Sequence, residues 1–222
     1  MFSALSAGIL GFLLGLRHAT DADHVVAVTT IVTRERTFGR AAWIGGLWGI
    51  GHSFTVFVVG GALVVFRVVI PPRLGLGLEF GVALMLILLG FNNLRSTATT
   101  DATAHGHEHP PRFSGWRPVL IGIVHGLAGS AAVAILVLAA IPETGWALAY
   151  LAVFGLGTII GMMLITWLIA APSVYAARRV VHFQRGIRLA AGALSLVFGL
   201  LLAHSIITQG GLFSASPSWS PR

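Results

Sequence analysis

The stretch His18-Ala19-Thr20-Asp21-Ala22-Asp23-His24 lies inside an otherwise apolar run that extends from residue 1 to residue 32. Ionisable side chains are costly at membrane depth, and where they occur there they mark functional sites by default. Two imidazoles and two carboxylates without sulfur suit a borderline or hard divalent cation such as Ni²⁺, Co²⁺, Zn²⁺ or Mn²⁺. The stretch therefore predicts a metal site within a membrane-spanning helix.

The spacing within this stretch separates one carboxylate from the other ionisable groups. At about 100° per residue, His18, Asp21 and His24 fall within roughly 120° on one helical face, whereas Asp23 points away. Either the helix is distorted here, or Asp23 acts from an outer shell by orienting a ligand. The alternative to a metal site is an interhelical hydrogen-bond cluster that contains a buried ion pair to Arg17.

The composition indicates a membrane protein, because 56% of the 222 residues are hydrophobic and 9% are charged. The chain has no cysteine, which excludes iron–sulfur clusters, thiolate metal sites and thiol redox chemistry. Apolar runs long enough to cross a bilayer occupy residues 4–32, 42–66, 74–94, 119–141, 146–171 and 189–207. We therefore expect an all-α, polytopic membrane protein with six transmembrane helices.

Two polar segments lie outside the predicted spans. Residues 95–117 form a loop with His105, His107 and His109, which either binds metal loosely or is an incidental linker. Residues 209–222 are rich in Gly, Ser and Pro, which predicts a disordered tail.

The net charge of +7 comes from 14 arginines and no lysine. Most of these arginines lie in the loops on the side that carries residues 95–117. By the positive-inside rule this side faces the cytoplasm. We therefore expect a cytoplasmic-membrane protein whose two termini lie on the outer side of that membrane. The pattern sets topology and gives no reason to expect nucleic-acid binding.

The two halves of the chain match weakly but in register, at shifts of 107 to 110 residues. The matched pairs include Gly15/Gly122, His18/His125, Gly51/Gly161 and Gly90/Gly199. A repeat with an odd number of spans is inverted in its second copy, and secondary transporters often place their substrate where such repeats meet. We therefore expect residues 1–94 and 118–208 to be two inverted three-helix repeats, with His18 facing His125.

The quoted stretch resembles the signature of the nickel/cobalt transporter family, H-A-x-D-A-D-H, at every fixed position. Gly51-His52-Ser53 resembles the G-H-S element of that family. Members commonly have eight spans and an acidic D-T-A-T-E element. This chain has six spans, and residues 125–131 instead resemble the shorter urease-associated branch. The resemblance implies that His18, Asp23 and His24 are needed for metal transport.

We expect a secondary transporter that takes up Ni²⁺ or Co²⁺ across the cytoplasmic membrane, and not an enzyme. No G-x-x-x-x-G-K-[S/T] motif occurs, so any ATP-driven step would need another chain. The metal is the substrate and no resident cofactor is expected. The candidate metal ligands are His18, Asp21, Asp23, His24, His52 and His125.

Two alternatives to uptake stay open. One is efflux of nickel, cobalt or another cation, and the other is a non-transporting membrane subunit that delivers metal to an enzyme. Besides the metal and the lipid bilayer, the partners that this interpretation allows are a second copy of the chain and a metallochaperone.

Overall fold

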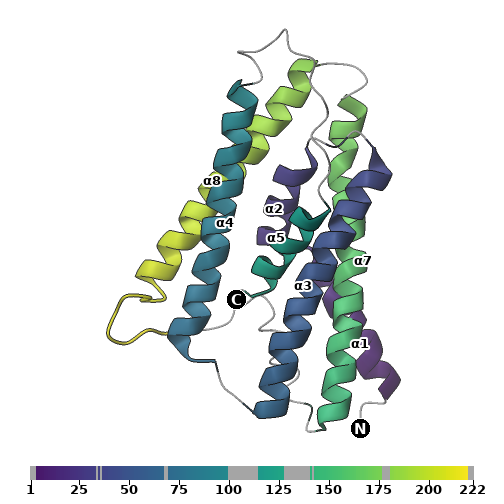
Figure 1. Ribbon diagram of the computed structural model, residues 1–222, viewed down its shortest axis with the longest axis vertical. Coiled ribbons are helices and arrows are strands. Elements are labelled where there is room, and N and C mark those ends of the chain that lie inside the picture. The colour runs from purple at the N-terminus through teal and green to yellow at the C-terminus, as the bar shows by residue number, and fades with distance from the viewer. Residues whose placement is uncertain are drawn as a thin grey trace.

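The computed structural model describes residues 4–33, 35, 37–67, 70–99, 115–127, 141, 143–176 and 181–219. Within these ranges the regular structure is helical and contains no strand, as Figure 1 shows. The helices are α1 (Ala4–His18), α2 (Ala22–Val32), α3 (Phe38–Phe66), α4 (Pro72–Thr99), α5 (Trp116–Gly126), α7 (Thr144–Ala176) and α8 (Val181–Thr208). The expected all-α fold is confirmed for this part of the chain.

In the described part of the chain, four helices, α3, α4, α7 and α8, are long and apolar enough to cross a membrane, and α1 and α2 are shorter apolar helices. Large apolar side chains cover their outward faces; Phe54, Leu164 and Leu201, for example, are exposed. Exposed apolar surface on this scale suits lipid better than water. The chain is therefore a multi-pass membrane protein.

The first and fourth predicted spans differ from the long helices. The run at residues 4–32 consists of two helices, α1 and α2, separated by a break at residues 19–21. The run at residues 119–141 begins as α5, and most of its remainder lies outside the described residues.

The long helices lie in two pairs, α3 with α7 and α4 with α8, while α1 packs on α7 and α5 packs on α3. Figure 1 shows α2 and α5 between the two pairs, near the middle of the molecule. Valine residues anchor α2 there, because Val28 and Val32 are buried in a core cluster with Trp48, Leu86 and Met162. This packing places the beginning of α2, and with it His24, deep inside the bundle.

The tail differs from the disorder that its composition predicts, because residues 209–219 fold back onto α4 and α8. The indole Nε1 of Trp219 donates a hydrogen bond to the buried carboxylate of Glu79 at 2.9 Å. The ring packs against a cluster that includes Leu76 and Ile206. Gly211 makes the turn with a φ of 64°, which favours glycine. The contact between Trp219 and the buried Glu79 holds the tail in a fixed place, which the composition of the tail does not predict.

Replacing Trp219 by alanine should lower the stability of the protein by about 2–4 kcal/mol, through loss of ring packing and of a donor to a buried carboxylate. Thermal unfolding in detergent measures the effect. Trp43→Ala is the matched control, because Trp43 is 56% exposed on α3. Equal midpoints for the two variants would mean that the tail contact does not stabilise the fold.

Candidate metal centre

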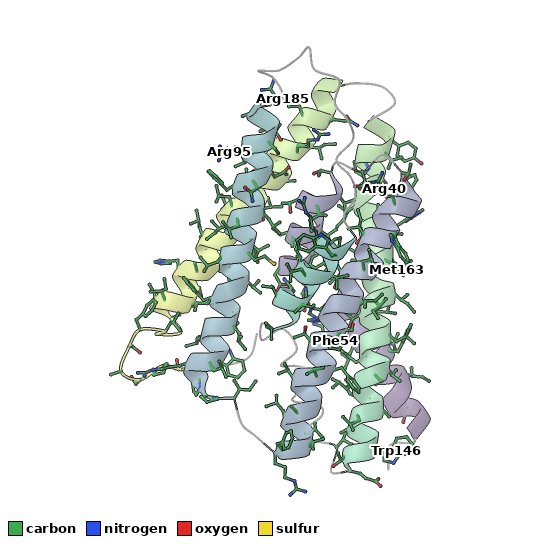
Figure 2. All side chains as sticks on the ribbon, in the orientation of Figure 1. Arg40, Phe54, Arg95, Trp146, Met163 and Arg185 are labelled. Atoms are coloured by element: carbon green, nitrogen blue, oxygen red, sulfur yellow. The ribbon has the colours of Figure 1, made fainter. Side chains whose placement is uncertain are left out.

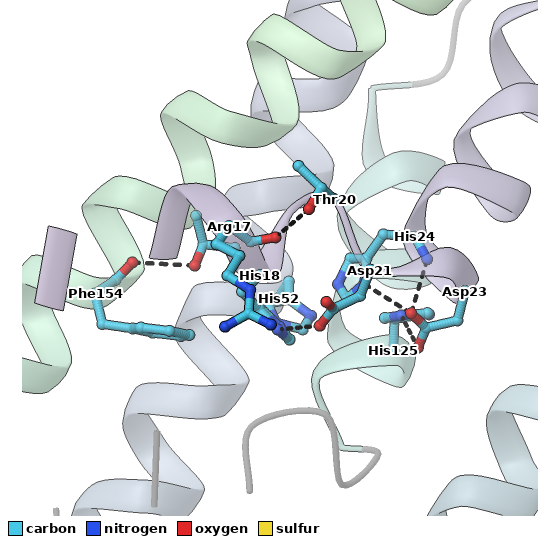
Figure 3. A network of polar contacts seen from close by, with 10 residues as sticks. Arg17, His18, Thr20, Asp21, Asp23, His24, His52, His125 and Phe154 are labelled. Carbon is cyan, nitrogen blue, oxygen red and sulfur yellow. Dashed lines mark hydrogen bonds and ion pairs between the residues drawn. The ribbon is translucent and has the colours of Figure 1, made fainter. Parts of the chain in front are cut away.

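The chain breaks its first apolar run at the sequence motif itself. The amides of Thr20 and Asp21 donate to the carbonyls of Arg17 and His18, at 2.8 and 3.1 Å. These are the tight turns that often end a helix. The Thr20 hydroxyl also donates to the Arg17 carbonyl, at 2.6 Å. On a helical wheel, a continuous helix would point Asp23 away from the histidines. The break is the helix distortion that the sequence left open as one alternative, and it turns Asp23 toward His24 and His125 (Figure 3).

One half of the cluster joins α1 to α3. The carboxylate of Asp21 accepts a hydrogen bond from His18 Nδ1 at 2.8 Å. In a neutral His18 the other ring nitrogen, Nε2, then carries a lone pair that can bind a metal ion. His18 Nε2 lies 3.1 Å from Nε2 of His52, which comes from the middle of α3. A cation bound at about 2.0–2.1 Å by two nitrogens needs them about 3 Å apart. The two imidazoles are therefore spaced to share one metal ion.

The other half joins the beginning of α2 to α5. One carboxylate oxygen of Asp23 lies 3.1 Å from His24 Nδ1 and accepts from the His24 backbone amide at 3.0 Å. The other oxygen lies 3.2 Å from His125 Nε2. Asp23 thus holds the ring of His24 and reaches the histidine of the second half of the sequence.

His24 connects the two halves of the cluster. Its ring centroid lies 4.7 Å from that of His18, 5.0 Å from that of His52 and 4.2 Å from that of His125. Two groups bring their potential ligand atoms within 4.8 Å of one another, and His24 belongs to both; they are His18/His24/His52 and Asp23/His24/His125. Five of the six predicted ligands therefore lie in one cluster, and the sixth, Asp21, lies beside it through its hydrogen bond to His18.

The four imidazoles of the cluster are buried. His24, His52 and His125 are completely buried, His18 is 6% exposed and Asp23 is 20% exposed. The buried atoms without a hydrogen-bond partner in the described part of the chain include three ring nitrogens of the cluster, His24 Nε2, His52 Nδ1 and His125 Nδ1. An unpaired buried polar atom costs about 1–3 kcal/mol. A divalent cation would satisfy such nitrogens, and neutral imidazole is its usual nitrogen ligand.

The two aspartates differ from what the wheel predicts. Asp21, placed there on the histidine face, is 47% exposed and bonds only His18 among the site residues. Asp23 contacts two histidines at the centre. Arg17 is exposed, so the buried ion pair of the alternative interpretation is absent from the described structure.

Two aromatic residues wall the cluster and were not predicted from the sequence. Trp48 stacks beside His24 with centroids 5.9 Å apart, and Phe154 lies 5.4 Å from His18. Trp48 precedes His52 by four residues, so helical spacing alone could have placed it next to the site. The histidines at 105, 107 and 109 lie outside the described residues.

The chain is similar to a family of nickel-transport proteins and to a urease accessory protein. A model of the family of high-affinity nickel-transport proteins, NicO, matches residues 4–98, which include every predicted ligand except His125. The urease accessory protein UreH of Bacillus sp. (strain TB-90) is 34% identical over 218 residues, 94% of this chain and 95% of UreH.

Shorter similarities connect the chain to two proteins named as nickel transporters. The high-affinity nickel transport protein of Cupriavidus necator is 35% identical over 78 residues, 35% of this chain and 22% of that protein. The nickel transporter NixA of Staphylococcus aureus is 42% identical over 53 residues, 23% of this chain and 16% of NixA. No solved structure matches the chain.

Proposed function

Because this chain belongs to the nickel/cobalt transporter family, in its short urease-associated branch, we propose that it takes up Ni²⁺ or Co²⁺ through the cytoplasmic membrane as a secondary transporter. It is a permease and not an enzyme, and the metal is its substrate. The observation that carries the proposal is the convergence of four buried imidazoles and Asp23 from four helices within the bundle.

We propose that the ion binds between the two halves of the cluster. His18, His24 and His52 offer imidazole nitrogens from one side, and Asp23 and His125 complete the shell from the other. The Asp23 carboxylate offsets part of the metal charge in a site that excludes water. Asp21 acts through His18, because its hydrogen bond to Nδ1 fixes the ring with Nε2 facing the ion.

We further propose six spans in two inverted repeats, residues 1–94 and 118–208, joined by the loop 95–117. Reciprocal contacts between α4 and α8 support this plan. A Cβ on Gly90 would meet the Gly192 carbonyl at 2.7 Å, and one on Gly199 would meet the Ala83 carbonyl at 2.9 Å. The same shift of 109 residues relates 83 to 192 and 90 to 199. A pseudo-two-fold axis produces such reciprocity.

The helices that carry the site show the same reciprocal packing between the two halves of the chain. α1 of the first half packs on α7 of the second, and α5 of the second half packs on α3 of the first. Under the axis, His18 and His125 are equivalent residues, and both belong to the cluster. Under this proposal the ion binds where the two repeats meet, which is where inverted-repeat transporters bind their substrates.

A second function, delivery of metal to a partner enzyme without transport, is favoured by one observation. The relative that matches the chain over nearly its whole length is named a urease accessory protein. A transporter moves metal into sealed vesicles on its own, whereas a delivery subunit binds metal without flux. Purified protein in liposomes therefore separates the two.

We expect proteoliposomes with the purified chain to accumulate radioactive Ni²⁺ without ATP. Acidifying both sides should weaken metal binding, because a protonated imidazole cannot ligate. A pH gradient should change the rate if protons exchange for metal. Protein-free liposomes are the control. Metal binding without any flux would contradict the transporter and support delivery, and flux only out of the vesicles would support efflux.

A further inference from the structure

A cavity of about 640 Å³ lies apart from the metal cluster, between α2, α4 and α5. Its polar lining consists of Thr30, Asn92, Asn93, Arg95, Ser96 and Arg117. Figure 2 places Arg95 at the end of the molecule that also carries Arg40 and Arg185, opposite Trp146. By the positive-inside rule, this is the cytoplasmic end. The cavity therefore opens near the cytoplasmic surface of the bilayer.

The charge of the lining selects an anion. Two guanidinium groups and no carboxylate are found among the described residues that line the cavity. The hydroxyls of Thr30 and Ser96 donate to carbonyls of their own helices, at 2.7 and 3.0 Å, and the Asn93 amide donates to the Arg188 carbonyl at 3.1 Å. The two guanidinium groups are the charged donors of the lining. A guanidinium offers paired N–H donors that match phosphate oxygens. A divalent cation is disfavoured beside the same two charges.

The rest of the lining is apolar and continues toward lipid. Ile31 and Leu89 complete the wall of the cavity. On α4, the neighbouring Leu88 and Phe91 are 60% and 52% exposed, so they face the hydrocarbon of the bilayer. A ligand that is anionic at one end and apolar along its length fits this surface better than a free anion does.

We propose that the cavity binds the phosphate headgroup of an anionic phospholipid through Arg95 and Arg117. The acyl chains then lie along α4, over Leu88 and Phe91. Basic pockets between transmembrane helices on the cytoplasmic side are suited to such headgroups. Since α4 and α5 make few direct contacts, the lipid bridges the α4–α8 pair to the helix that carries His125. Lipid binding therefore stabilises the fold.

Thermal unfolding of the full chain in a neutral detergent tests the proposal with phosphatidylglycerol and phosphatidylcholine as probes. Phosphatidylglycerol should raise the midpoint of the wild type by at least about 3 °C more than phosphatidylcholine does. Arg95→Gln/Arg117→Gln should lose this difference. The matched control, Arg40→Gln/Arg185→Gln, removes the same charge from the same end outside the cavity and should keep it.

The outcomes separate a lipid from other sources of the shift. Equal shifts in the two double variants would overturn the proposal, because surface charge alone would explain them. A full shift with inorganic phosphate would also overturn it in favour of a free anion. If the cavity variant does not fold, native mass spectrometry of the wild type and Arg117→Gln decides. Retained phosphatidylglycerol on the wild type and less on the variant supports the site, and equal retention refutes it.

Discussion

Replacing His24 by alanine is expected to lower the initial rate of Ni²⁺ uptake at least about 100-fold, more than the loss of an outer-shell partner costs a metal site. Among the described residues, His24 is the one that belongs to both candidate ligand groups. Its side chain is completely buried, so no water-filled space is at hand to replace the lost nitrogen. Uptake of radioactive nickel by cells at low metal concentration, normalised to the amount of protein in the membrane, measures the effect.

His204→Ala is the matched control for this experiment, because it removes an exposed histidine from α8, outside the cluster. It should leave uptake unchanged. His24→Asn keeps a polar side chain of similar size and guards against a variant that fails to fold. Wild-type uptake by both His24 variants would refute the proposed site. Binding of nickel to purified protein by equilibrium dialysis should fall in parallel with uptake.

The residues of the cluster could be predicted from the sequence, but the roles of its two aspartates could not. Four ionisable groups inside an apolar run have few explanations other than a functional site. The weak internal repeat added His125, because it aligns with His18. The wheel failed because it takes the helix as continuous. The Thr20 hydroxyl and the bond between Asp21 and His18 satisfy groups at the break, and this local competition changes the direction of Asp23.

Hydrophobicity predicted that the four long helices exist but not where they end. An apolar run marks only the part of a helix that crosses the hydrocarbon of the bilayer. The helices themselves continue into polar residues beyond the hydrocarbon. The predicted spans 42–66, 74–94, 146–171 and 189–207 correspond to Phe38–Phe66, Pro72–Thr99, Thr144–Ala176 and Val181–Thr208. The place of the tail depends on contacts between residues far apart in the sequence, such as Trp219 with Glu79 and Leu212 with the Leu76 cluster, which no local pattern in the sequence predicts.

Two glycines at equivalent positions of the proposed repeats, Gly15 in α1 and Gly122 in α5, should tolerate no side chain. A Cβ on Gly15 would run into the Phe154 carbonyl oxygen of α7, and one on Gly122 into the Trp48 carbonyl oxygen of α3. Backbone atoms cannot give way, so either alanine variant separates two helices at a cost of about 1–3 kcal/mol or more.

Each glycine precedes a histidine of the cluster by three residues, so separating the helices also displaces His18 or His125. Gly15→Ala and Gly122→Ala should therefore lower both the unfolding midpoint in detergent and nickel uptake, by similar amounts if the repeats are equivalent. Gly8→Ala and Gly77→Ala are the controls, since a Cβ there meets nothing within 4 Å. They should be neutral or stabilising by up to about 1 kcal/mol, because alanine favours a helix over glycine. A loss at Gly15 without one at Gly122 would contradict the two-fold relation, because the axis makes each helix contact the image of the other.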